Sequence, residues 1–341
     1  MNIIVHIGHG KTGSSSIQST LLKNSLELVA QGFFYTGLNF EHMASKNFLW
    51  QRADGWNDLL YSPQDRVDVE LVSIISQVID EARAKDCHTI IWSNESLFGH
   101  HALVGNAIEH IRAQGHEFHV VGYIRRHDSW ALSAYKQWGL KHKTYPGKIK
   151  TFDEWMATQN IRFAGALHLW ASGNWVRFSV RNFDACNDVV EDFLGFCGID
   201  FSSLEIIREN DSPSLVALGL WTIFNSQFDG EVLPKELNSF LMQYGLIGSS
   251  IEHVDMGALL PDSKALKAVL DERLGDINAL NEYLKASGQP PLDITPNDGV
   301  LEPITESIIL SALLKVVKDQ NEQLKNLQQR LSQLEKSLLK E

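Results

Sequence analysis

The sequence predicts a doubly wound α/β fold, in which a mainly parallel sheet carries helices on both faces. Four short apolar segments, at residues 3–7, 88–93, 118–124 and 175–180, are typical of inner strands. Amphipathic helical patterns lie between them, and this alternation is the signature of a parallel sheet. Such sheets bind ligands at the carboxyl ends of their strands. The residues that directly follow each strand are therefore the first candidates for function.

Composition narrows the class of protein. The chain has 341 residues and a formal net charge of −12, which argues against a general nucleic-acid binder or an anionic-membrane binder. Its three cysteines form no CxxC pair, so neither a disulfide framework nor a zinc site is indicated. The first residues lack the features of a signal peptide, and the apolar run at 215–224 is too short to span a bilayer. We expect a cytoplasmic protein without a membrane span.

The first strand runs through a glycine-rich turn into a helix expected at residues 17–30. Gly8, Gly10 and Gly13 allow a tight turn and a close approach of the backbone to an anion. Free amides and the dipole at the start of the helix attract negative charge, and Lys11 adds a full positive charge. The segment therefore predicts a phosphate-binding loop. Its candidate ligand residues are Gly10, Lys11, Thr12, Gly13, Ser14, Ser15 and Ser16.

The spacing within this loop separates two kinds of phosphate chemistry. A nucleoside triphosphatase loop has the form GxxxxGK[ST], and Val5 stands where its first glycine would be. The loop is thus not a regular Walker A motif. An ATP-dependent P-loop kinase of a small molecule stays as an alternative, although it would also need an acidic partner for magnesium and none stands out.

The third strand, at 118–124, ends in two arginines. Arg125 stands at the strand end, and Ser133 lies eight residues later on a helix expected at 129–140. A guanidinium can grip a phosphate with two parallel hydrogen bonds. Arg126 is the spare, with a role as surface charge or carboxylate partner. Arg125 and Ser133 are therefore candidates for a second phosphate subsite.

Together, KTGSSS after the first strand and the Arg125–Ser133 spacing after the third resemble the sulfotransferase family, in particular the bacterial carbohydrate-type enzymes with a P-loop-like fold. The resemblance implies 3′-phosphoadenosine 5′-phosphosulfate as donor and the 3′,5′-bisphosphate as product. It implies that Lys11 stabilises the leaving group and that residues 10–16 hold the 5′-phosphate. Arg125 and Ser133 would hold the 3′-phosphate. No metal is expected.

Sulfuryl transfer also needs a base that takes the proton of the acceptor's hydroxyl or amine. Glu95 is the first candidate, because SNESLF follows the second strand directly. In the resembling family a histidine or a glutamate does this work. His42, in the loop after the first helix, is the second candidate. Trp50, Trp56 and Tyr61 share that region and could stack on a sugar ring or form a local core. The acceptor is expected to be carbohydrate-like.

The rest of the chain is mainly helical. Residues 67–84 form a helix between the first two strands, and residues 176–200 are similar to the strand, turn and helix that follow in bacterial sulfotransferases. Further helices are expected at 215–227, 235–244 and 263–287, before a linker at 288–299. We expect a nucleotide-binding core at 1–211, a helical extension with linker at 212–299, and a long helix or coiled coil at 300–341.

The last segment carries an a/d heptad pattern over four repeats, which is typical of a coiled coil. The a positions are Leu310, Val317, Leu324, Leu331 and Leu338, and the d positions are Leu313, Gln320, Leu327 and Leu334. Self-association through residues 310–341 is the expectation. A third reading of the whole chain is a non-catalytic nucleotide-binding scaffold that acts through this coiled coil.

Overall fold

The computed structural model describes residues 1–52, 54–173, 177–209, 215–226, 228–232 and 259–295, with scattered positions between 305 and 331. The chain divides into two compact units. The first comprises Met1–Trp130, Asn160–Asn210 and Lys267–Thr295, and the second comprises Ala131–Gln159, Asp211–Leu266 and Pro296–Glu341. The domain boundaries expected at residues 211 and 299 stay predictions.

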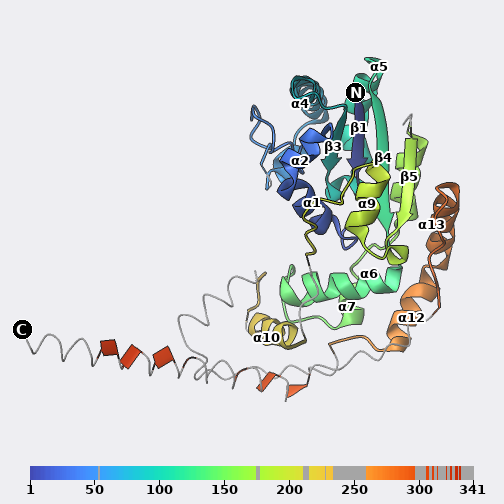
Figure 1. Ribbon diagram of the computed structural model, residues 1–341. Helices are drawn as coiled ribbons and strands as arrows, with labels where there is room; N and C mark the ends of the chain where they lie inside the picture. The colour runs from blue at the N-terminus through green and yellow to red at the C-terminus, as the bar shows by residue number, and fades with distance from the viewer. Residues whose placement is uncertain are drawn as a thin grey trace, which may run out of the picture. The chain divides into compact units, whose positions relative to one another are not determined.

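A five-stranded sheet forms the centre of the first unit (Figure 1). Its strands are β1 (Asn2–His6), β2 (Phe33–Tyr35), β3 (Thr89–Ser93), β4 (Glu117–Ile124) and β5 (Arg177–Asn182). They lie in the order β2-β3-β1-β4-β5, and all four neighbouring pairs are parallel. The predicted parallel α/β sheet is confirmed. Sequence reasoning missed β2, because three residues are too few to show a periodicity.

Helices cover both faces of this sheet (Figure 1). The helical elements of the first unit are α1 (Ser14–Lys23), α2 (Ser25–Ala30), α3 (Trp56–Leu60), α4 (Gln64–Ala84), the 3-10 turn η1 (Glu95–Gly99), α5 (His101–Ala113), α6 (His127–Ala134, which ends in the second unit), α8 (Ala164–Ser172), η3 (Phe183–Ala185), α9 (Val189–Cys197) and α13 (Leu274–Ala286). The single helix expected at 17–30 is two helices that meet at Asn24. The Asn24 side-chain amide donates to the carbonyls of Thr20 and Glu205, which fixes the break.

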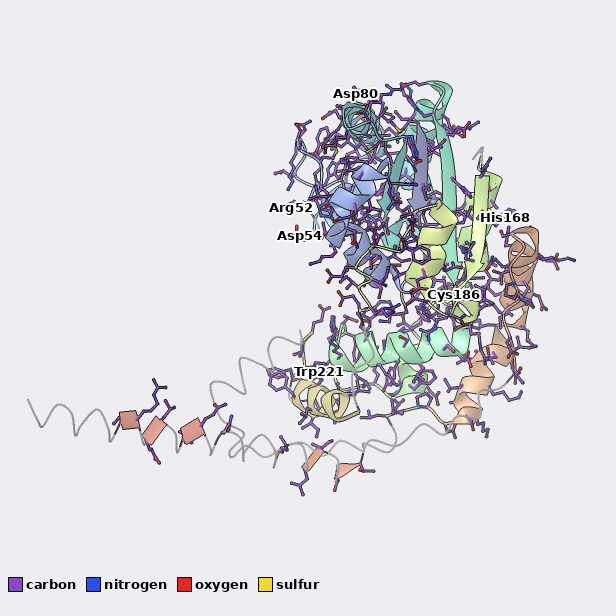
Figure 2. The ribbon with its side chains drawn as sticks, viewed as in Figure 1. Arg52, Asp54, Asp80, His168, Cys186 and Trp221 are labelled. Carbon is purple, nitrogen blue, oxygen red and sulfur yellow. The ribbon has the colours of Figure 1, made fainter. Side chains whose placement is uncertain are left out.

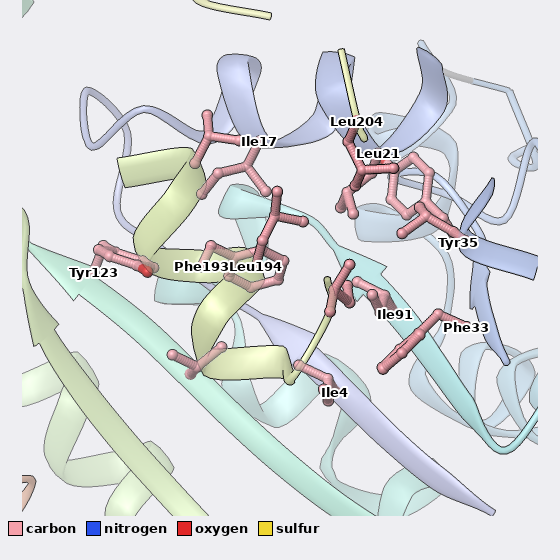
Figure 3. Packing of buried hydrophobic residues seen from close by; sticks show 14 residues of the cluster. Ile4, Ile17, Leu21, Phe33, Tyr35, Ile91, Tyr123, Phe193, Leu194 and Leu204 are labelled. Carbon is pink, nitrogen blue, oxygen red and sulfur yellow. The ribbon is translucent and has the colours of Figure 1, made fainter. Parts of the chain in front are cut away.

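The strands bury side chains on both faces of the sheet, and Figure 3 shows the cluster on one of these faces. Ile4, Ile91 and Tyr123 point to one face, where Leu21 of α1 and Phe193 of α9 cover them. The next residues along each strand point to the other face, which α4 and α5 cover. A fully buried side chain of this size contributes about 1.5–3 kcal/mol to folding. This packing fixes α1, and therefore the turn before it, against the end of β1.

The second unit contains the π-helical turn η2 (Tyr135–Lys141), α7 (Phe152–Met156) and α10 (Leu215–Asn225), and α12 (Ser263–Glu272) runs across its boundary with the first unit. Lys143 is fully buried there, and its ammonium donates to the carbonyls of Phe228 and Gly230. The helix expected at 235–244 lies outside the described residues. The coiled coil of 300–341 is not established by the scattered positions described there.

Two further points bear on the sequence predictions. Cys87, Cys186 and Cys197 are free thiols, and Cys186 follows β5 (Figure 2). Burial raises the pKa of Cys186 to about 12, so its thiol stays protonated and unreactive near neutral pH. Over the ranges that the structure describes, no helix is both long and apolar enough to cross a membrane.

Candidate anion-binding site

Three strand ends meet at one edge of the sheet. His6 at the end of β1 is in register with Ser93 of β3 on one side and with Val121 of β4 on the other. The chain leaves β1 toward the β2 side and leaves β4 toward β5, so the direction of winding reverses between β1 and β4. Crevices of this kind are where open α/β sheets bind ligands. The turn at residues 7–13 lies at this crevice.

Backbone hydrogen bonds fasten the turn to β4. The Ile7 amide donates to the Val121 carbonyl over 2.9 Å, and the His9 amide donates to the Tyr123 carbonyl over 3.3 Å. The Thr12 hydroxyl donates to the His9 carbonyl over 2.6 Å. Lys11 has φ 71°, a left-handed conformation that costs a residue with a side chain about 1–3 kcal/mol. These hydrogen bonds therefore hold the turn in a backbone conformation that is unfavourable for a lysine by itself.

The start of α1 has backbone amides that no hydrogen bond within the helix uses. The first intrahelical bond runs from the Ile17 amide to the Gly13 carbonyl over 3.2 Å, so the amides of residues 14–16 have no acceptor within the helix. Gly13, the N-cap residue, has no side chain that could accept hydrogen bonds from these amides, and the first turn of the helix contains no acidic residue. An anion placed here would receive several N–H donors and the favourable end of the helix dipole.

Gly13 is fitted to its place in two ways. Its φ is 80°, and a Cβ added there would lie 2.5 Å from Cγ1 of Val189. We expect Gly13→Ala to lower the free energy of unfolding by about 2–4 kcal/mol, since the strain of a left-handed alanine adds to overpacking. Gly115→Ala is the control, because Gly115 has φ 88° with nothing within 4 Å, and it should lose only about 1 kcal/mol. Urea unfolding measures both; equal losses would contradict the role of the Val189 contact.

The four predicted hydroxyls divide into two kinds. Thr12 is used inside the turn, and the Ser16 hydroxyl accepts the Glu209 amide over 2.9 Å. Ser14 is buried, and its hydroxyl has no hydrogen-bond partner among the described residues, while Ser15 is exposed. Thr12 and Ser16 therefore build the loop, and Ser14 and Ser15 are the hydroxyls best placed to contact an anion.

His9 joins the loop to the end of β4. Its Nε2 accepts the Arg125 amide over 3.1 Å, so the proton is on Nδ1, which donates to the Gly10 carbonyl over 3.0 Å. Phe163 stacks on the imidazole with ring centres 4.2 Å apart. Burial lowers the pKa of His9 to about 3. His9 is thus a neutral residue with a structural role. Its tautomer is fixed by a hydrogen bond to Arg125, which is 116 residues away and cannot be inferred from sequence spacing.

This burial predicts a pH effect on stability. Because the folded-state pKa of His9 lies below the unfolded value near 6.5, the unfolded chain binds a proton between these two values and the folded chain does not. The stabilisation of the folded state that comes from keeping His9 neutral is complete above pH 6.5 and decreases as pH falls toward 3. We expect the stability of His9→Gln to decline about 2 kcal/mol less than that of the wild-type chain between pH 7 and pH 5. Parallel curves in urea titrations would contradict this.

The two arginines after β4 separate. Arg125 turns to the loop: its Nη1 donates to the Lys11 carbonyl over 3.2 Å. Its Nε is buried without a hydrogen-bond partner in the described part of the chain and lies 3.4 Å from Oδ1 of Asp184. Arg126 instead forms a two-point pair with Asp128, at 3.1 and 2.9 Å, and donates to the Thr295 carbonyl. Arg125 is therefore the arginine at the crevice.

Burial lowers the pKa of Arg125, and the charge of Asp184 opposes that effect. A guanidinium remains protonated under such conditions, so its positive charge lies beside the loop. Ser133 lies in α6 but belongs to the second unit, and Arg125 belongs to the first. The pairing of these two residues around one phosphate stays a prediction.

The two candidate bases share a neighbourhood. Glu95 is the first residue of η1, and its Oε2 accepts the Gln18 side-chain amide over 2.8 Å. His42 lies 3.8 Å from Glu41, and its ring centre is 5.5 Å from that of Tyr35. Burial raises the pKa of Tyr35 above its usual range, and the charges of Glu41 and Glu95 add to this. Tyr35 therefore lies beside His42 and within electrostatic range of Glu95, two candidates that are 53 residues apart in the sequence.

A separate cavity of about 460 Å³ lies along α5, lined by residues that include Gln64, His101, Glu109, Arg112 and Ser172. It contains no residue of the loop. Within the described ranges, no group of three or more histidine, cysteine or acidic side chains is arranged to hold a metal ion. Comparisons of the chain with protein-family models, with curated proteins and with solved structures find no match.

Proposed function

We propose that the chain is a sulfotransferase that moves a sulfuryl group from 3′-phosphoadenosine 5′-phosphosulfate to a hydroxyl or amine of a carbohydrate-like acceptor. One observation carries the proposal: the Arg125 guanidinium, the candidate for the 3′-phosphate, contacts the Lys11 carbonyl within the loop that is the candidate for the 5′-phosphosulfate. A ligand with two anionic groups needs two such subsites side by side.

The residues present fit this donor. The uncapped amides of residues 14–16 and the buried Ser14 hydroxyl suit one phosphate. The buried Nε of Arg125, which lacks a hydrogen-bond partner within the described residues, suits the other. When bound, the donor supplies an activated sulfuryl group whose leaving group is a phosphate.

Each chemical role then falls to a residue of the chain. Lys11 neutralises the negative charge that develops on the leaving phosphate. Glu95 accepts the proton of the acceptor while the new bond to sulfur forms. The loop amides and Arg125 hold the donor in line, since displacement at a charged centre depends mainly on positioning. His42 is the alternative base.

The kinase alternative is less well supported. Val5, at the position of the first Walker glycine, is fully buried within β1 and pairs with Trp92 and Val120. The turn therefore begins later than a triphosphate loop requires.

Titration calorimetry separates the two ligands. We expect 3′-phosphoadenosine 5′-phosphate to bind with low micromolar or tighter affinity, roughly −8 kcal/mol, and ATP with magnesium to bind more weakly. Tight binding of ATP with magnesium and no binding of the bisphosphate would reject the sulfotransferase. A screen of glycans with labelled donor then identifies the acceptor.

Self-association through residues 310–341 belongs to the same proposal. Four heptad leucines at described positions are helical and exposed by 55–60%, which leaves their apolar side chains for a second copy of the chain. They are Leu310, Leu324, Leu327 and Leu331. Removing residues 310–341 should reduce the sedimentation mass by a factor of about two. A monomer both with and without the segment would contradict the coiled coil.

A further inference from the structure

The candidate base lies at one end of a hydrogen-bonded chain that reaches the phosphate loop. The Gln18 amide nitrogen donates to Glu95 Oε2 over 2.8 Å. The same nitrogen also contacts Ser93 Oγ and the Ser93 carbonyl, each at 3.3 Å. Ser93 Oγ lies 2.7 Å from Nδ1 of His6, in a fully buried contact. Four side chains from α1, β3, β1 and the start of η1 are thereby connected.

The other end of this series of hydrogen bonds is His6, which lies next to Gly8 of the loop. His6 is fully buried, and its Nε2 has no hydrogen-bond partner among the described residues. A Cβ added at Gly8 would lie 2.9 Å from this Nε2 and 2.8 Å from the Thr12 hydroxyl. Burial lowers the pKa of His6 to about 3. A neutral imidazole therefore supports Ser93 directly beneath Gly8.

Gln18 is placed to connect the two halves of the reaction. It lies four residues after Ser14 on α1, so both side chains are on the same face of the helix. The helix whose first turn offers donors to the anion thus also holds one oxygen of the candidate base. Three contacts from one amide nitrogen, one to Glu95 and two to Ser93, hold the Gln18 amide in place and, through it, one oxygen of the carboxylate.

We propose that Gln18 is a positioning residue, which orients the Glu95 carboxylate relative to the sulfuryl group and is itself anchored by Ser93 and His6. This inference rests on the proposed function. Misplacement of a catalytic group by about 1 Å can reduce a rate by about 100-fold. Loss of the Gln18 contact should therefore slow the chemical step without weakening donor binding.

The test uses donor hydrolysis by the full chain, so that no acceptor need be known. Water replaces the acceptor: its oxygen forms a bond to sulfur as the bond between sulfur and the bridging phosphate oxygen breaks. Glu95 takes one proton of the water, and the products are hydrogen sulfate and the 3′,5′-bisphosphate. Release of labelled sulfate gives the rate, calorimetry with the bisphosphate gives the affinity, and the melting temperature shows whether each variant folds.

Gln18→Met keeps the length of the side chain but removes its N–H donors. We expect a rate about tenfold lower and an affinity within about twofold of wild type. Gln18→Glu, which places a like charge beside Glu95, is the second variant and should lose at least as much. Ser19→Ala, the control on the same helix, removes a contact with Glu209 and should leave both quantities unchanged.

A double-mutant cycle decides whether Gln18 acts through Glu95. Glu95→Gln alone should lower the rate about 100-fold, and Gln18→Met should cause no further loss in that background. An equal tenfold loss in both backgrounds, or wild-type hydrolysis by Gln18→Met, would overturn the inference while leaving the proposed function intact. A wild-type chain that does not bind the bisphosphate would reject the function itself. One that binds it but releases no sulfate would overturn Glu95 as base, and the inference with it.

Discussion

Replacing Lys11 with alanine should lower sulfuryl transfer by about 1000-fold while the affinity for the 3′,5′-bisphosphate changes by less than about tenfold. The reason is that a preorganised charge at a developing anion contributes mainly to the transition state, with typical losses of roughly 10²–10³ for one donor and more for a full charge. In the proposed mechanism the ammonium interacts most strongly with the leaving phosphate as its bond to sulfur breaks. In the proposed mechanism, donor binding relies instead on the α1 amides, which have no side-chain cap, and on Arg125, which contacts the loop.

The substitution of Lys11 by alanine does not require a change in backbone conformation. Lys11 has φ 71°, and alanine carries the same Cβ, so the backbone strain of the turn is unchanged. Lys11→Arg keeps the charge and should recover part of the rate. Release of labelled sulfate gives the rate of the wild-type, Lys11→Ala and Lys11→Arg chains, and calorimetry gives their affinity for the bisphosphate. A Lys11→Ala chain that keeps its rate but loses its affinity would assign Lys11 to ground-state binding instead.

The sheet and the loop were predictable because both leave local patterns. Apolar runs alternating with helices indicate parallel strands, and a glycine-lysine turn before a helix indicates an anion site. By contrast, the division of labour among the hydroxyls depends on distant residues. Ser16 is occupied by the amide of Glu209, which is 193 residues away. No spacing within the loop could distinguish Ser16 from Ser14.

The same reasoning applies to the charges. Sequence spacing named Arg125 as the candidate and Arg126 as the spare, and the fold shows the contacts that separate the two side chains. Asp128 and the Thr295 carbonyl hold Arg126 in place, while Asp184 lies beside Arg125. Asp184 and Thr295 are 59 and 170 residues away from Arg125 in the sequence, so no local spacing indicates these contacts. Likewise, the role proposed for Gln18 depends on the register of β1 and β3, which places Ser93 beside His6.

Arg125→Ala should raise the dissociation constant of the 3′,5′-bisphosphate by about 100-fold, which is close to 3 kcal/mol. A charge-assisted, two-point contact with the 3′-phosphate would be lost, and it is made in the ground state as well as in the transition state. Adenosine 5′-phosphosulfate, which lacks the 3′-phosphate, should bind the wild-type and Arg125→Ala chains with nearly equal affinity. That comparison isolates the contribution of one phosphate.

Arg126→Ala is the matched control, because the Arg126 guanidinium is bound to Asp128 and to the Thr295 carbonyl. The affinity of this variant for the bisphosphate should stay within about twofold of wild type. Arg125→Lys keeps the charge without the planar fork and should fall between the two. Asp184 still accepts the Arg126 amide over 2.7 Å in the wild-type structure, so its carboxylate keeps a partner when Arg125 is removed. Calorimetry that finds equal losses for Arg125→Ala and Arg126→Ala would show a general effect of positive charge and would remove Arg125 from the 3′-phosphate subsite.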